Sequence, residues 1–151
     1  MIRLLFLSYG HIAEPPMAAY IMTHLVREAR LADRIIVASA TLAKLPAPLC
    51  REAQALLEAH HIPMEEDTHF SLEWKSYDDY DFILLMNTAQ SSALFNTLGG
   101  DVDEKFHLLS EYAACPMTLS NPYETHRFAQ AFMQEQACCQ GLLEKLENWI
   151  R

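Results

Sequence analysis

The chain has 151 residues, 51% of them apolar, and a formal net charge of −9 at pH 7. This length and composition predict one domain, spanning residues 1–151, with a single sizeable core. The excess of negative charge argues against nucleic acid or an anionic membrane as a partner, because the field of the chain repels phosphate groups.

The cysteines and histidines favour a cytoplasmic protein without a metal site. Cys50, Cys115, Cys138 and Cys139 form no C-x-x-C pair, and the seven histidines show no H-x-x-x-H spacing. We therefore expect reduced, mostly buried thiols, no metal and no cofactor. No apolar run approaches the roughly 18 residues of a membrane span, and "IRLLFL" is too short for the apolar part of a signal peptide.

Apolar runs alternate with helical periodicities along the chain. The predicted strands are residues 2–8, 34–40, 80–87 and 115–120. The predicted helices lie between and after them: from Pro16, over 48–61, over 88–98, and from about Glu124 to the end. This alternation predicts a three-layer α/β/α fold with a four-stranded parallel sheet.

In such a fold the ligand crevice lies beyond the carboxyl ends of the strands. Three segments are expected at that edge, namely Ser8–Pro16, Asn87–Gln90 and Ser120–Tyr123. The first of them runs from a strand into a helix, as phosphate-binding turns do.

Five segments resemble the low-molecular-weight protein tyrosine phosphatase family in both order and spacing. The family's C-x-G-N-x-C-R-S-P-M-A-E motif corresponds here to "SYGHIAEPPMAA", residues 8–19. Its S-A-x-T, H-G-I-P, F-x-x-F-D-x-I-L-x-M-D and V-x-D-P-Y-Y segments correspond to "ASAT" (38–41), "HHIPM" (60–64), "YDDYDFILLMN" (77–87) and "LSNPYE" (119–124). The resemblance covers nearly the whole chain and implies the fold of that family.

The resemblance also implies three catalytic residues, and this chain differs at each of them. Ser8 stands in place of the cysteine nucleophile, whose thiolate is far easier to form than an alkoxide. Glu14 stands in place of the arginine that holds two phosphate oxygens. Asn121 stands in place of the aspartic acid that protonates the leaving group. The functional prediction is therefore a pseudophosphatase that binds or regulates, and no catalytic residue is expected.

The alternative prediction is an enzyme, either a protein tyrosine phosphatase with residual activity on phosphotyrosine or small phosphoesters, or another hydrolase that uses Ser8. Ser8, His11 and Glu14 have the residue types of a serine–histidine–acid triad, although crowding in one tight loop makes the necessary alignment rare. The expected partner is a protein or a small molecule, and the expected state is a monomer or weak dimer.

The predicted binding residues gather on the three segments at the crevice: Tyr9, Gly10, His11, Ile12, Ala13, Glu14, Asn87 and Tyr123. Glu14 has two interpretations. It accepts free amides at the start of its own helix and fills the place of the phosphate, or it turns outward and, with Asn87 and Asn121, offers oxygens to a cation or a polar neutral ligand. Tyr9 and Tyr123 are expected to flank the mouth.

The remaining polar and thiol residues are given structural roles. Cys138 and Cys139 fall in the last predicted helix and are expected to be packing residues. The acidic clusters Glu65–Asp67 and Asp101, Asp103 and Glu104 are expected in solvated loops.

Overall fold

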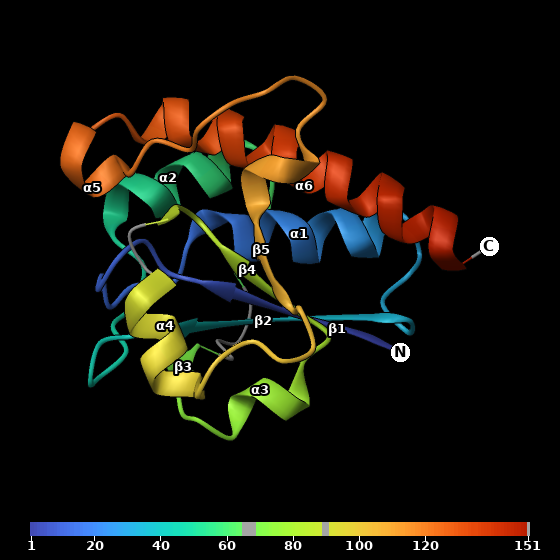
Figure 1. Ribbon diagram of the computed structural model, residues 1–151. Helices are drawn as coiled ribbons and strands as arrows, with labels where there is room; N and C mark the ends of the chain where they lie inside the picture. Colours follow the sequence, from blue (N-terminus) through green and yellow to red (C-terminus); the bar gives the residue numbers. More distant parts are fainter. Residues whose placement is uncertain (65–68, 89–90, 151) are drawn as a thin grey trace.

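The computed structural model describes residues 1–64, 69–88 and 91–150. Its sheet has five parallel strands in the order β3-β2-β1-β4-β5 (Figure 1). The strands are β1 (Ile2–Leu7), β2 (Ile35–Thr41), β3 (Phe70–Ser71), β4 (Phe82–Leu85) and β5 (Phe106–Leu108). The parallel arrangement expected from the alternation of strands and helices is confirmed, but the sheet has five strands where four were predicted.

Helices cover both faces of this sheet (Figure 1). The upper layer contains α1 (Met17–Glu28), α2 (Arg51–Ala59) and α6 (Phe128–Ile150), and the lower layer contains α3 (Ser76–Asp79) and α4 (Ser91–Leu98). A 3-10 helix, η2 (Leu109–Tyr112), follows β5, and the short α5 (Pro122–Thr125) precedes α6. None of the described helices is long and apolar enough to span a membrane.

Successive side chains of β1 lie on alternate faces of the sheet, and the core is divided into two apolar clusters, one on each face. Leu4 and Phe6 belong to the apolar cluster under α1, α2 and α6, whereas Leu5 and Leu7 belong to the cluster over α3 and α4. Successive side chains of a strand point to opposite faces, so a strand covered on both sides needs an unbroken apolar run. This explains why "LLFL" sits at the centre of the sheet, with all four side chains fully buried.

The predicted strand at 115–120 is wrong. Those residues form no strand, and the place beside β4 is taken by β5, while β3 lies at the opposite edge. The segment is coil, in which Leu119 is buried and the Met117 sulfur lies 3.6 Å from the Cys138 thiol. β3 and β5 have two and three residues, too few for a periodicity to be read.

The last helix is also interrupted where one continuous helix was predicted. His126 adopts a left-handed conformation (φ 60°) after α5, and α6 begins two residues later. Of the thiols, Cys138 and Cys139 are buried as expected, Cys50 is half-buried, and Cys115 is exposed. The acidic cluster at 65–67 lies outside the described residues.

Candidate functional site

The segment between β1 and α1 is a tight loop tied to its surroundings through its own carbonyl groups. Gly10 has a positive φ of 48°, which a glycine adopts without steric cost. The hydroxyl of Thr41, the last residue of β2, donates to the Ile12 carbonyl at 2.7 Å. The Ala13 carbonyl accepts from the Ala47 amide at 3.1 Å. With its carbonyls turned outward in this way, the loop is held at the carboxyl edge of the sheet.

His69 gives the loop a further anchor. Its Nε2 lies 2.7 Å from the Ala13 carbonyl and its Nδ1 lies 2.8 Å from the Ser39 hydroxyl. Because a carbonyl only accepts, Nε2 donates to Ala13. The imidazole connects the loop to β2.

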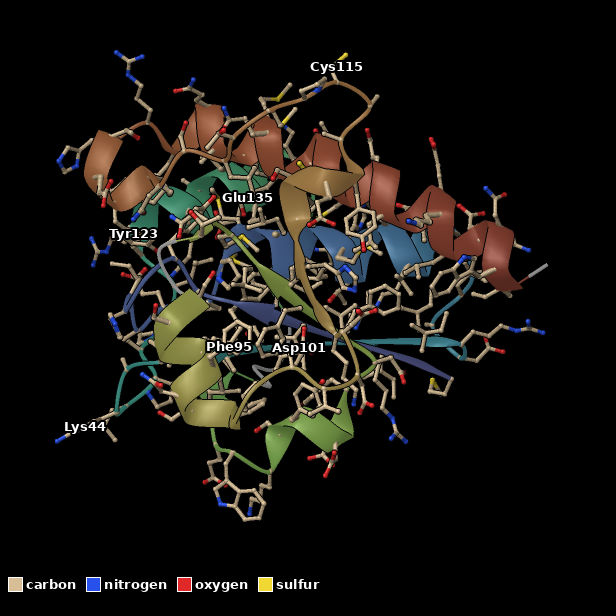
Figure 2. All side chains as sticks on the ribbon, viewed as in Figure 1. Lys44, Phe95, Asp101, Cys115, Tyr123 and Glu135 are labelled. Atoms are coloured by element: carbon tan, nitrogen blue, oxygen red, sulfur yellow. The ribbon has the colours of Figure 1, made fainter. Side chains whose placement is uncertain are left out.

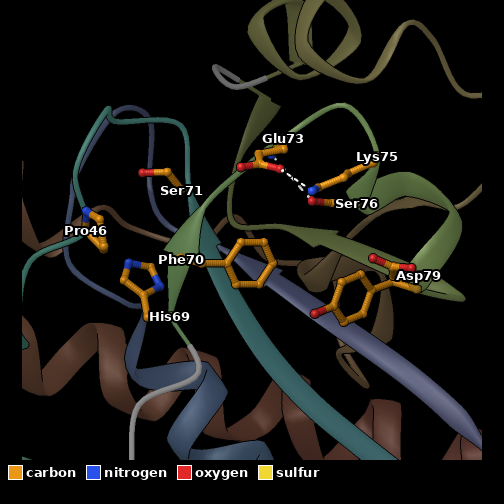
Figure 3. A pocket seen from close by; sticks show the side chains of 9 residues that line it. Pro46, His69, Phe70, Ser71, Glu73, Lys75, Ser76 and Asp79 are labelled. Atoms are coloured by element: carbon orange, nitrogen blue, oxygen red, sulfur yellow. Dashed lines mark hydrogen bonds and ion pairs between the residues drawn. The ribbon is translucent and has the colours of Figure 1, made fainter.

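A cavity of about 410 Å³ lies beside this anchor, between β3 and α3 (Figure 3). His69 and Pro46 line one end of it, and the Glu73–Lys75 ion pair, at 3.2 Å, borders the other. His69 thus both supports the loop and forms part of this cavity wall.

Ser8 is almost completely buried, and its hydroxyl holds the loop closed. The Ser8 amide donates to the Ala40 carbonyl at 3.0 Å, and the Ser8 hydroxyl donates to the main-chain carbonyl of Glu14 at 2.6 Å. A serine nucleophile instead donates its proton to a basic side chain. His11 is exposed, and the Glu14 carboxylate bonds elsewhere, so the triad geometry is not formed.

The Glu14 carboxylate points across to two other elements. Its Oε1 accepts the amide of Cys50, the residue that caps α2, at 2.6 Å, and the hydroxyl of Tyr123, in α5, at 2.9 Å. The carboxylate therefore forms its hydrogen bonds inside the protein. The amide that it accepts is at the start of α2, whereas amides at the start of its own helix α1 had been expected. Only the structure reveals this partner, 36 residues away in the chain.

Burial and the Glu14 charge keep the neighbouring groups neutral. Burial, and then the nearby Glu14 carboxylate, raise the pKa of the Tyr123 hydroxyl. The same two causes raise the pKa of the Cys50 thiol. Since the thiolate is the reactive form of cysteine, Cys50 is a poor nucleophile here.

Tyr9 does not flank the mouth, contrary to expectation. Its ring is buried, and its hydroxyl donates to Glu135 Oε2 at 3.1 Å. Glu135 Oε1 accepts the amide of Ala18, in the first turn of α1, at 2.8 Å. Glu135 lies in α6, so this carboxylate joins the loop, α1 and α6 (Figure 2).

Sequence reasoning missed Glu135, although a signal was present. The residue occupies the apolar stripe of the last helix between Phe132 and Cys139, where a charged side chain is out of place. The structure leaves Glu135 without solvent exposure, and burial raises its pKa to about 7.

The other predicted residues are placed around the same edge. Asn121 caps α5 by accepting the Tyr123 amide at 3.0 Å. Asn87 follows β4 and is half-buried. Residues 89 and 90, the rest of the segment expected at that edge, lie outside the described ranges. Within those ranges, no group of three or more histidine, cysteine, aspartate or glutamate side chains is arranged to hold a metal ion.

Comparison with known proteins agrees with this architecture. The chain is 22% identical to YfkJ from Bacillus subtilis, with a TM-score of 0.89, covering all of this chain and 98% of that one. It is 21% identical to SP-PTP, a low molecular weight protein tyrosine phosphatase from Streptococcus pyogenes, with a TM-score of 0.80 and coverage of 97% and 93%.

Sequence comparison reaches the same group of proteins. The chain is 23% identical to the low molecular weight protein-tyrosine-phosphatase PtpA of Staphylococcus aureus (strain MRSA252), over 95% of this chain and 93% of that protein. The sequence profile described as "Low molecular weight phosphotyrosine protein phosphatase" matches residues 3–150. The chain belongs to the low molecular weight phosphotyrosine protein phosphatase family.

Proposed function

We propose that this chain is a pseudophosphatase, a cytoplasmic single-domain protein that binds or regulates a partner without hydrolysing phosphoesters. One observation carries the proposal. The Glu14 carboxylate is bonded to the Cys50 amide and the Tyr123 hydroxyl at the phosphate-loop edge of the sheet. A negative charge thus occupies the position at which the family motif has a positive one.

The magnitude of this reversal supports the loss of anion binding. Two unit charges 4 Å apart interact by roughly 4 kcal/mol at an effective dielectric constant near 20. Exchanging an attractive partner for a repulsive one therefore changes phosphate affinity by several kcal/mol. The loop amides offer only partial compensation, since Pro15 has no amide proton to donate.

The chemistry of the other two positions supports the same proposal. The Ser8 proton is donated to a carbonyl, which cannot act as a base. Asn121 uses its side-chain oxygen to cap α5, and an amide does not transfer a proton to a leaving group. Family membership favours the competing function, dephosphorylation. Measurements of turnover and of phosphate binding distinguish a phosphatase from a pseudophosphatase.

The first experiment measures turnover. The parent chain is expected to release p-nitrophenol from p-nitrophenyl phosphate no faster than the Ser8→Ala variant, because the Ser8 hydroxyl donates its proton to a carbonyl and the loop repels the substrate. A steady-state assay over pH 5–8 provides the measurement. A parent rate that disappears in Ser8→Ala would make the chain an enzyme and end the proposal.

The second experiment measures phosphate binding by thermal melting. Millimolar orthophosphate is expected to leave the melting temperature of the parent unchanged relative to chloride at equal ionic strength, and to raise that of Glu14→Arg. A ligand at 100 times its Kd adds about 2.7 kcal/mol of stability, which a melt detects readily. Glu14→Gln is the matched control, since it removes the negative charge without adding a positive one. Stabilisation of the parent by phosphate contradicts the proposal.

A further inference from the structure

A second cavity, of about 550 Å³, opens away from the phosphate loop. Its wall is built from the start of β4, β5 and the segment before it, η2, and the last turns of α6. Phe82 is the first residue of β4, so the cavity lies toward the amino-terminal edge of the sheet, whereas Ser8 and Glu14 follow the carboxyl end of β1. The volume is that of a small-molecule site.

Four aromatic rings follow one another along the wall. The centroids of Trp149 and Phe82 are 5.5 Å apart, those of Phe82 and His107 are 5.4 Å apart, and those of His107 and Tyr112 are 6.4 Å apart. Trp149 belongs to the last turn of α6 and is 61% exposed. Phe82 is buried, with 8% exposure, so Trp149 is the ring of this row that is largely open to solvent.

Carboxylates surround these rings. Asp81, Asp103, Glu104 and Glu111 all line the cavity, and all four residues are exposed. Asp103 and Glu104 belong to the acidic cluster expected in a solvated loop, and the structure places them at the rim of an aromatic cavity. Four carboxylates line the cavity beside one lysine and His107, so the cavity attracts cations. Two of the carboxylates also accept main-chain amides, Asp81 that of Arg3 and Glu111 that of Leu108.

Lys145 already places a cation against one of the aromatic rings of the cavity. The Lys145 ammonium lies 5.3 Å from the centroid of the Tyr112 ring, within the range of a cation–π interaction. An ammonium group is therefore accommodated against this wall. Because Lys145 is exposed, its ammonium also competes with any cation that enters from solvent.

We propose that this cavity binds an organic cation bearing a methylated ammonium group, of about the size of choline. The methyl groups would pack on the exposed ring of Trp149, and the positive charge would lie among the carboxylates. A strongly hydrated metal cation gains little from such a wall, whereas a quaternary ammonium is weakly hydrated and suits aromatic faces. The proposal is independent of the function of the phosphate loop.

Trp149 itself reports the binding. The chain has two tryptophans, and Trp74→Phe leaves Trp149 as the only one. In that background, choline chloride is expected to change the Trp149 fluorescence saturably. The neutral isostere 3,3-dimethylbutan-1-ol has the same shape without the charge and is expected to bind at least about tenfold more weakly. Sodium chloride keeps the ionic strength constant.

Charge variants test the mechanism of recognition. Lys145→Gln removes the internal competitor and is expected to tighten choline binding by about threefold or more. Lys44→Gln makes the same change of charge at an exposed lysine far from the cavity (Figure 2) and is expected to have little effect. Glu104→Gln is expected to weaken binding by about threefold. Trp149→Leu, followed by calorimetry, is expected to weaken it by at least about fivefold.

Three results would overturn the proposal: no saturable change up to 50 mM choline, equal affinity for choline and the neutral alcohol, or equal effects of Lys145→Gln and Lys44→Gln. The same titration with a trimethyllysine peptide and its unmethylated control identifies the source of the cation. Tighter binding of the methylated peptide than of choline assigns the site to a modified protein partner. Tighter binding of choline assigns it to a free small molecule.

Discussion

Replacing Gly141 with alanine is expected to lower the free energy of unfolding by roughly 2–3 kcal/mol. A Cβ at this position in α6 would lie 1.7 Å from the carbonyl oxygen of Tyr112 and 2.8 Å from its carbonyl carbon. These are main-chain atoms of η2, which cannot move aside as a flexible side chain can. Overpacking of this kind usually costs about 1–3 kcal/mol, and sometimes more.

This loss of stability is opposite in sign to the effect of the same substitution in an isolated helix. Glycine within a helix is normally less stable than alanine by about 0.5–1 kcal/mol, so the substitution would help if nothing lay nearby. Urea denaturation of Gly141→Ala beside Gln140→Ala, at an exposed position one residue earlier, measures the difference. The control is expected to change stability by less than about 0.5 kcal/mol. A Gly141→Ala protein as stable as the parent would contradict the close approach of α6 and η2.

The stability of the protein is expected to fall as the pH rises from about 4.5 to about 7, the interval between the ordinary pKa of a glutamate and that of buried Glu135. Burial raises its pKa from the ordinary 4.5 to about 7. Between these values the unfolded chain has released the proton while the native protein keeps it, so raising the pH favours unfolding. The stabilising contribution is complete below about pH 4.5 and is lost as the pH rises through about 7. The difference in pKa corresponds to roughly 3 kcal/mol.

Glu135→Gln removes this titration and is expected to gain stability over the parent as the pH rises from 5 to 8. The neighbouring groups do not titrate in this window, because burial raises the pKa of the Cys138 thiol to about 11 and also raises those of Tyr9 and Cys139. Glu144→Gln, on the exposed face of α6, is the control and is expected to follow the parent. Parallel stability curves for the parent and Glu135→Gln would refute the prediction.

Much of the fold was predictable because the relevant information is local. The unbroken apolar run at residues 4–7 predicts a buried central strand, and the helical stripe from Phe128 onward predicts a helix packed across the sheet. Five motif segments have the order and spacing of one family, and this match predicts how the elements are arranged. β3 and β5 were not predicted because two or three residues show no periodicity in the sequence. They form strands only by pairing with β2 and β4. The run 115–120 has strand-like composition, but the place beside β4 belongs to β5.

The candidate site was predictable in its residues but not in its contacts. Ser8, Glu14 and Asn121 were identified from their motif positions alone. The partners of Glu14 and Tyr9 lie 109 and 126 residues away, at Tyr123 and Glu135. No local pattern carries such a pairing, since it depends on how α5 and α6 pack over α1 and the loop.

The sequence by itself determined the family, the parallel three-layer architecture and the change of charge at the loop, because residue type and spacing suffice for each of these. Only the tertiary structure decided where the Glu14 carboxylate points, that Tyr9 is buried on Glu135, and that four rings and four carboxylates share one cavity. Side-chain direction and burial result from packing between distant elements, and hydrogen bonds form only where that packing brings a donor within about 3 Å of its acceptor.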